Sequence, residues 1–149
     1  MTQRAADSQV RLSETSSASE TEQFGARLAE EVSAGEVVLL HGDLGAGKTT
    51  LVRGFARALG VTDPITSPTF AIGHRYAGSQ VTIAHLDLYR VRELAAEDPG
   101  LLEDYLDAAN ITLVEWAEVA AETLPQARLR ITLTHMGGER RRIEAVRLA

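Results

Sequence analysis

Residues 37–50 read VVLLHGDLGAGKTT. The stretch opens with four β-branched or aliphatic residues, Val37 to Leu40, which is typical of a strand buried on both faces. Gly42 to Thr49 then match the pattern G-x-x-x-x-G-K-[ST] in full. Apolar residues with helical spacing follow, and they are Leu51, Val52, Phe55, Ala56 and Leu59. The order of strand, glycine-rich loop and helix predicts a loop of the P-loop type.

Such a loop binds phosphate because its glycines let backbone N–H groups converge on the anion, above the positive end of a helix. We predict that the loop holds a nucleoside triphosphate through Gly42, Asp43, Leu44, Gly45, Ala46, Gly47, Lys48, Thr49 and Thr50. Lys48 is expected to reach the β- and γ-phosphates, and the Thr49 hydroxyl to bind magnesium. Lys48 is the only lysine among 15 basic residues. An N-K-x-D guanine motif is therefore excluded, which favours ATP over GTP.

Two acidic residues end predicted strands. Asp87 closes the extended segment Val81 to Asp87, and Glu115 closes Ile111 to Glu115. Ligands of open α/β sheets collect at the carboxyl ends of the strands, and magnesium prefers hard oxygen ligands. We expect Asp87 and Glu115, with Thr49, to be the metal ligands. Either carboxylate could also orient an attacking water. Taken alone, each is equally consistent with a carboxylate at the end of a strand that caps a helix or faces solvent.

The remaining segments complete an α/β fold. We predict a P-loop NTPase-like three-layer sandwich, whose mixed sheet has a parallel core and a C-terminal β-hairpin. Residues 1–12 are interpreted as a flexible tail or edge strand, and residues 13–149 as a single P-loop ATPase domain. The predicted elements are a helix over 18–33, extended segments over 69–76 and 81–87, acidic surface helices within 93–107, a helix over 117–124, and a hairpin turning at Gly137-Gly138.

Composition narrows the setting in which the chain works. The 149 residues carry a net charge of −6, which argues against a broad basic surface that grips nucleic acid. Apolar runs are far shorter than the roughly 20 residues that span a bilayer, and no secretory signal is evident. We expect a cytoplasmic protein without a membrane span, and any RNA contact to be local or indirect.

Several motifs together resemble one family. They are GDLGAGKTT at Gly42–Thr50, SPTF at Ser67–Phe70, HLDLYR at His85–Arg90, EDYL at Glu103–Leu106 and VEW at Val114–Trp116. In this order and at about this spacing they resemble the bacterial TsaE family, also called YjeE, the ATPase of tRNA threonylcarbamoyladenosine biosynthesis. The resemblance covers nearly the whole chain.

The resemblance implies roles for several of these residues. Lys48 and the loop amides would hold ATP, Thr49 and Glu115 would be associated with magnesium, and Asp87 would lie at the phosphate end of the nucleotide. Thr69 and Trp116 occupy family motif positions near that site. A family arginine near the C-terminus corresponds to one of Arg140, Arg141 and Arg142, and the sequence does not choose among them.

The resemblance also implies partners. Family members work with TsaB and TsaD, which modify the adenosine next to the anticodon, and the TsaE-like component hydrolyses ATP to reset the complex between rounds. No in-cis arginine finger is evident, so the isolated chain is expected to be slow. Two other functions stay open. One is an independent small-molecule kinase, although residues 93–107 do not resemble an arginine-bearing lid, and the other is a binding subunit that ATP merely stabilises.

Overall fold

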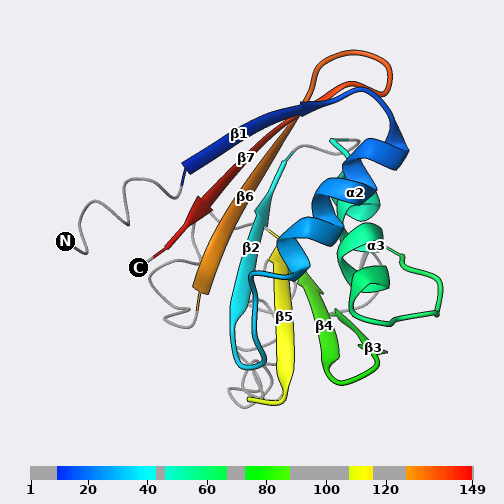
Figure 1. Cartoon of the computed structure of the whole chain (residues 1–149), viewed down its shortest axis with the longest axis vertical. Coiled ribbons are helices and arrows are strands. Elements are labelled where there is room, and N and C mark those ends of the chain that lie inside the picture. The colour runs from blue at the N-terminus through cyan, green and yellow to red at the C-terminus, as the bar shows by residue number, and fades with distance from the viewer. Residues whose placement is uncertain (1–9, 43–45, 67–72, 88–107, 116–126, 149) are drawn as a thin grey trace.

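The chain folds around one seven-stranded sheet in the computed structural model, which describes residues 10–42, 46–66, 73–87, 108–115 and 127–148 (Figure 1). Its elements are β1 (Val10–Thr15), α2 (Ala18–Ala29), β2 (Val37–His41), α3 (Lys48–Ala58), β3 (Gly73–Ala77), β4 (Thr82–Asp87), β5 (Asn110–Glu115), β6 (Ala127–His135) and β7 (Arg141–Arg147). Neither α2 nor α3 is long and apolar enough to cross a membrane, and the same holds for every helix within the described ranges.

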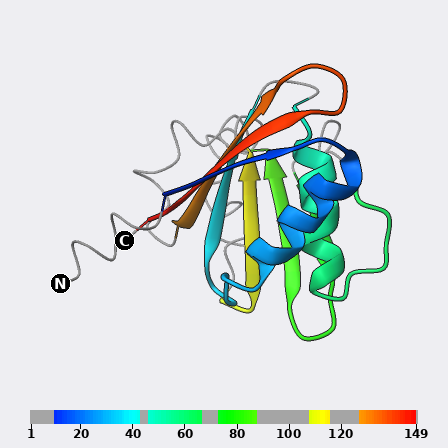
Figure 2. The ribbon, with the colours of Figure 1, turned by 45° about the horizontal axis from the view of Figure 1, so that its top comes forward.

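The sheet has a parallel centre and antiparallel edges. Its strand order is β1-β7-β6-β2-β5-β4-β3. The strands β6, β2, β5 and β4 run parallel to one another, while β3, β7 and β1 are added antiparallel (Figure 2). This confirms the predicted mixed sheet with a parallel core. The C-terminal hairpin of β6 and β7 is also confirmed, and its turn has positive φ at Gly137 (105°) and Gly138 (56°).

The first helix is shorter than predicted. It begins as expected, because the Ser17 side chain accepts a hydrogen bond from the Glu20 backbone N–H at 3.1 Å. It ends at Ala29 and not at residue 33. The backbone N–H groups of Glu30 and Glu31 donate to carbonyl oxygens three residues earlier, and this tightens the last turn. Val32 lies after the helix, in the connection to β2, but it is buried with the core. Its side chain therefore continued the four-residue apolar spacing from which the longer helix was predicted.

Helices α2 and α3 cover one face of the sheet (Figures 1 and 2). Their backbones touch because glycines lie at the crossing: a Cβ on Gly54 would overlap the carbonyl oxygen of Glu22, and one on Gly25 would overlap that of Leu51. Fully buried residues of α3, Val52 and Phe55 among them, pack in the core between the helices and the sheet. The predicted helices within 93–107 and over 117–124 lie outside the described residues.

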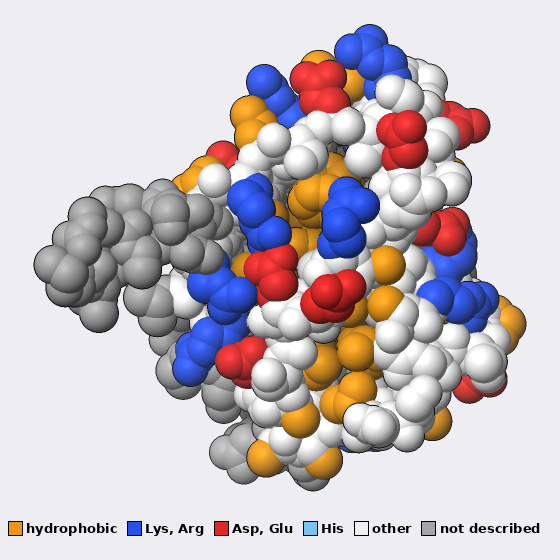
Figure 3. All heavy atoms as spheres, in the orientation of Figure 1, with side chains coloured by type: hydrophobic (Ala, Val, Ile, Leu, Met, Phe, Trp, Pro, Cys, Tyr) orange, Lys and Arg blue, Asp and Glu red, His pale blue; other side chains and the backbone are white. Residues whose placement is uncertain are grey.

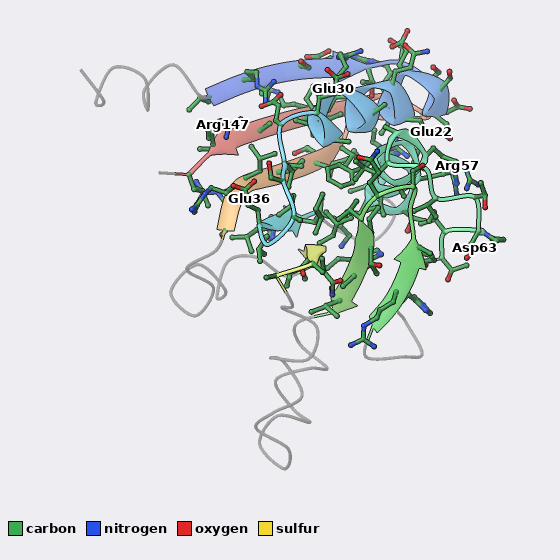
Figure 4. The ribbon with its side chains drawn as sticks, turned by 60° about the horizontal axis from the view of Figure 1, so that its bottom comes forward. Glu22, Glu30, Glu36, Arg57, Asp63 and Arg147 are labelled. Carbon is green, nitrogen blue, oxygen red and sulfur yellow. The ribbon has the colours of Figure 1, made fainter. Side chains whose placement is uncertain are left out.

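Charges of both signs are interspersed on the face that carries α2 (Figure 3). Glu31 accepts hydrogen bonds from Arg11 at 2.5 Å and from Arg147 at 3.2 Å, and Glu36 lies 3.4 Å from Arg128. Figure 4 labels Glu36 and Arg147 on this side of the sheet. Partly exposed pairs of this kind contribute only ~0–1 kcal/mol each, so the apolar core carries most of the stability.

Residues 1–12 remain only partly described. Val10, Arg11 and Leu12 lie in β1, which pairs with β7 at an edge of the sheet. Val10 and Leu12 are exposed, as suits such an edge. Residues 1–9 lie outside the described residues, so the proposed division of the chain stays a prediction.

We predict that Gly54→Ala destabilises the fold, although alanine is the better helix former by about 0.5–1 kcal/mol. The added methyl group would overlap the α2 backbone, and overpacking of this kind costs about 1–3 kcal/mol. Urea denaturation of the chain without nucleotide measures the effect. Ser19→Ala, at an exposed position of α2, is the control and should stay within about 0.5 kcal/mol. A Gly54→Ala chain as stable as the parent would contradict the close crossing.

Candidate functional site

The glycine-rich loop joins the end of β2 to the start of α3. Gly47 is the N-cap residue, directly before the first residue of α3, and its backbone is left-handed, with φ 98° and ψ 16°. Only glycine adopts this conformation at little cost. Gly47, at the N-cap, has no side chain that could cap the helix, and its first turn, Lys48 to Thr50, contains no acidic residue. Among the described residues, the start of α3 therefore suits an anion.

Lys48 folds back toward Gly42, the residue with which the loop begins. Its ammonium donates a hydrogen bond to the carbonyl oxygen of Gly42 at 2.6 Å, and it lies 3.4 Å from Oε1 of Glu115. The lysine side chain is 17% exposed, so the charge is largely withdrawn from water. The predicted cation and one predicted carboxylate thus lie together near Gly42.

Glu115 lies at the end of β5, between the ends of two other strands. Its backbone is in register with Leu40 of β2 and with Asp87 of β4. The two predicted acidic positions are therefore neighbours at the carboxyl edge of the parallel sheet, next to the residues that lead into the loop. Glu115 is only 8% exposed, which is unusual for a carboxylate.

His85 is the second partner of Glu115; it begins the HLDLYR motif but was not among the predicted site residues. Its Nε2 lies 2.6 Å from Oε2 of Glu115, and the histidine is fully buried. His85 pairs in register with Leu113, so it is the diagonal neighbour of Glu115 on the same face of the sheet. A signal was present, because His85 precedes Asp87 by two residues and side chains two apart on a strand share a face.

The environment of Glu115 keeps its carboxyl group ionised. Burial by itself raises the pKa of Glu115, but the hydrogen bond from His85 and the charges of His85 and Lys48 lower it further than burial raises it. The net pKa lies below its ordinary value of 4.5. A buried, ionised carboxylate beside a loop that suits phosphate is able to bind a cation or to orient a water molecule.

A small cavity of about 40 Å³ adjoins the loop on its other side. It is lined by Ala18, Thr21, Gly47, Thr50, Glu139 and Arg141. The hairpin of β6 and β7 therefore reaches the start of α3, and it is held at the start of α2 by a hydrogen bond from the Ala18 N–H to Glu139 at 3.1 Å.

Of the three consecutive arginines, Arg141 is the one at the loop. A Cβ on Gly47 would lie 3.1 Å from Nε of Arg141, and that buried Nε has no hydrogen-bond partner among the described residues. Arg140 and Arg142 are exposed, and Arg140 lies 3.8 Å from Glu14. Consecutive residues of a strand point to opposite faces, so the pairing of β7 determines which arginine faces the loop.

The other predicted residues differ in how far they are described. Ala46 is buried, while Thr49 and Thr50 are half-buried in the first turn of α3. Several predicted residues lie outside the described ranges, and these are Asp43, Leu44, Gly45, Thr69 and Trp116. For Asp87 the backbone register is described. The binding and catalytic roles of all these residues stay predictions.

The parallel sheet, the loop at its carboxyl edge and the uncapped helix that follows together define a protein of the P-loop class. Comparison with known proteins narrows this class. The family model described as threonylcarbamoyl adenosine biosynthesis protein TsaE matches residues 15–143. The chain belongs to the TsaE family.

Individual relatives agree with the family model. The tRNA threonylcarbamoyladenosine biosynthesis protein TsaE of Bacillus subtilis is 41% identical over 124 residues, which are 83% of this chain and 77% of the relative. The protein of the same name from Streptomyces coelicolor is 40% identical over 119 residues, covering 78% of this chain and 80% of the relative. A crystal structure of YdiB from Bacillus subtilis superposes with a TM-score of 0.75 at 33% identity, covering 94% of this chain and 86% of YdiB.

The lowered pKa of Glu115 predicts a specific contribution to acid unfolding. The folded chain binds this proton less tightly than the unfolded chain, so ionised Glu115 stabilises the fold above pH 4.5. The contribution is lost as the pH falls below 4.5 through the lower pKa of the folded state. We expect the difference in unfolding free energy between the parent and Glu115→Gln to be largest near neutral pH and to shrink below pH 4.5.

Urea denaturation across this pH range, without nucleotide or metal, measures the difference. Glu30→Gln is the matched control, because Glu30 is exposed at the end of α2 (Figure 4). A difference for Glu115→Gln that does not change with pH would contradict the assigned environment of the carboxyl group.

Proposed function

We propose that the chain is a magnesium-dependent ATP hydrolase that serves tRNA threonylcarbamoyladenosine biosynthesis. The observation that supports this most directly is the 3.4 Å approach of the Lys48 ammonium to the Glu115 carboxylate, beneath an uncapped helix start. A cation, a carboxylate and free N–H groups are the parts from which P-loop proteins assemble phosphoryl-transfer sites.

Lys48 would change partners when nucleotide binds. In the structure, its ammonium donates a hydrogen bond to the Gly42 carbonyl oxygen and lies 3.4 Å from Oε1 of Glu115. A triphosphate in the loop offers more negative charge than one carbonyl dipole, so the ammonium would turn to the β- and γ-phosphates. Catalysis would then come from positioning and from neutralisation of the charge that develops on the phosphate oxygens.

The residues present suit magnesium bound together with phosphate. Glu115 supplies an ionised carboxylate and Thr49 a hydroxyl, and both are hard oxygen ligands. No group of three or more His, Cys, Asp or Glu able to hold a metal occurs within the part of the chain that the structure describes. We propose that Thr49 and Glu115, with Asp87, hold the ion jointly with the nucleotide. The ion would supply further charge neutralisation at the phosphates, and Glu115 or Asp87 would orient the attacking water.

Membership of the TsaE family supports the biological assignment. We propose that TsaB-like and TsaD-like proteins are the partners, and that ATP hydrolysis drives or resets the complex that modifies the adenosine next to the anticodon. The net charge of −6 and the mixed charges around α2 (Figure 3) favour local or indirect contact with tRNA. Such a subunit would work in the cytoplasm, where its partners and tRNA are found.

We predict that Lys48→Ala abolishes measurable ATP turnover and weakens ATP binding, because no other lysine is present to take its place. Lys48→Arg should also fail, since a planar guanidinium is too large for a cradle shaped around a compact ammonium. Steady-state phosphate release and calorimetric titration with ATP and magnesium measure the two effects.

Arg53→Ala is the control on the same helix. Arg53 is partly exposed and lies 3.4 Å from Glu22, so its loss should leave turnover unchanged. Transfer of labelled γ-phosphate to a small-molecule acceptor would favour a kinase instead. ATP that binds and stabilises the chain without being turned over, with or without partners, would favour a binding subunit.

We further predict that the isolated chain is slow and that TsaB-like and TsaD-like partners from the same organism accelerate it. The reason is that the sequence shows no arginine-finger motif; Arg141 lies beside Gly47, and we expect that a partner still has to complete the site or order its loops. ATP turnover is measured for the chain alone and with both partners, and Lys48→Ala with the same partners corrects for contaminating activity. Equal rates with and without partners would contradict the idea.

A further inference from the structure

The two oxygens of the Glu115 carboxylate have different partners. Oε2 lies 2.6 Å from Nε2 of His85, and Oε1 lies 3.4 Å from the ammonium of Lys48. The shorter contact is the more deeply buried, since the His85 side chain is 0% exposed and the Lys48 side chain 17%. One oxygen therefore faces His85 on the neighbouring strand β4, and the other faces Lys48 at the start of α3.

His85 makes this contact as a hydrogen-bond donor. An ionised carboxylate only accepts hydrogen bonds, so the proton of the pair lies on Nε2 of His85. The other ring nitrogen, Nδ1, is buried and has no hydrogen-bond partner among the described residues. Glu115 is thus the one polar side chain to which the described structure ties the ring.

The position of His85 in the sheet makes it a rigid support. It lies in β4, whose backbone is paired on both sides, with β3 and with β5, and its ring is fully buried, so surrounding atoms leave the ring little room to move. Lys48, in contrast, projects from the start of a helix on a flexible side chain and would leave Glu115 when phosphate arrives. The histidine contact is the one that would persist through a cycle of nucleotide binding.

We propose that His85 is a positioning residue for Glu115. By holding Oε2, it keeps Oε1 directed at the loop, where the carboxylate meets first the Lys48 ammonium and then the ligands that replace it. The inference deepens the proposed function and rests on it, since it assigns His85 to the ATP hydrolysis site. A hydrogen bond from outside the ligand shell commonly orients a carboxylate that acts on metal or water.

Two substitutions separate the hydrogen bond from the packing of the ring. His85→Phe keeps a planar ring of similar size and removes the donor. His85→Gln loses the ring but carries an amide N–H at about the distance of Nε2 from the backbone. We expect His85→Phe to lower kcat for ATP about 10-fold or more, the size of effect typical of such supporting residues, with KM for ATP nearly unchanged. His85→Gln should recover most of kcat.

His74→Phe is the matched control. His74 lies on β3 directly opposite His85 in register, but on the far side of β4 from Glu115. Its ring contacts Tyr76 with a centroid distance of 5.9 Å, and it is not part of the proposed site. Turnover of this variant should equal that of the parent.

A double-mutant cycle with Glu115→Gln gives a readout that needs no nucleotide. The melting temperature is measured for the parent, His85→Phe, Glu115→Gln and the double variant, all without ATP or metal. We expect the double variant to lose clearly less than the sum of the two single losses, because both remove the same contact. In the Glu115→Gln background, His85→Phe should also cause no further loss of kcat.

The outcomes distinguish this inference from the proposed function. Wild-type kcat in a folded His85→Phe chain, or strictly additive losses of melting temperature, would overturn the role of His85 and leave ATP hydrolysis standing. A parent chain with partners that does not turn over ATP would overturn both. If His85→Phe does not fold, His85→Asn takes its place, because its amide is too short to reach Glu115. Equal kcat for His85→Asn and His85→Gln would then contradict the proposal.

Discussion

The parallel pairing of β2 with β5 and β6 is the constraint on which the rest of the structure depends. It brings the end of the strand that leads into the glycine-rich loop beside the end of the strand that carries Glu115. These two segments are more than seventy residues apart in the chain. Because parallel strands end at the same edge, the pairing brings the loop, the lysine and the carboxylate together, although they come from distant parts of the chain.

The packing of α2 against α3 positions the start of α3, where the glycine-rich loop ends. The crossing of α2 over α3 at Gly25 and Gly54 leaves no room for side chains, so the two helices have little freedom to shift relative to each other. The start of α2 and the hairpin of β6 and β7 then enclose the cavity beside Gly47. The arrangement gives the start of α3 a rigid surrounding, which a site that works by positioning requires.

Two neighbouring side chains determine the ionisation of the buried carboxyl group of Glu115. Burial raises the pKa of this carboxyl group, but His85 and Lys48 together lower it further and favour the ionised form. One partner lies on β4, a strand paired on both sides, and the other lies at the start of a helix. The site therefore combines a fixed contact with one that is able to change, as a cycle of ligand binding and release demands.

Local patterns in the sequence determined the elements, the loop and two acidic strand ends, because glycine content, hydrophobic spacing and capping residues act within a few positions of one another. The end of α2 was missed, since the buried Val32 kept the helical spacing after the helix had ended. His85 as the partner of Glu115, and Arg141 as the arginine at Gly47, were decided only by the tertiary structure. Both depend on strand register, which is set when distant segments pair, so the local pattern of either segment does not say which side chains will meet.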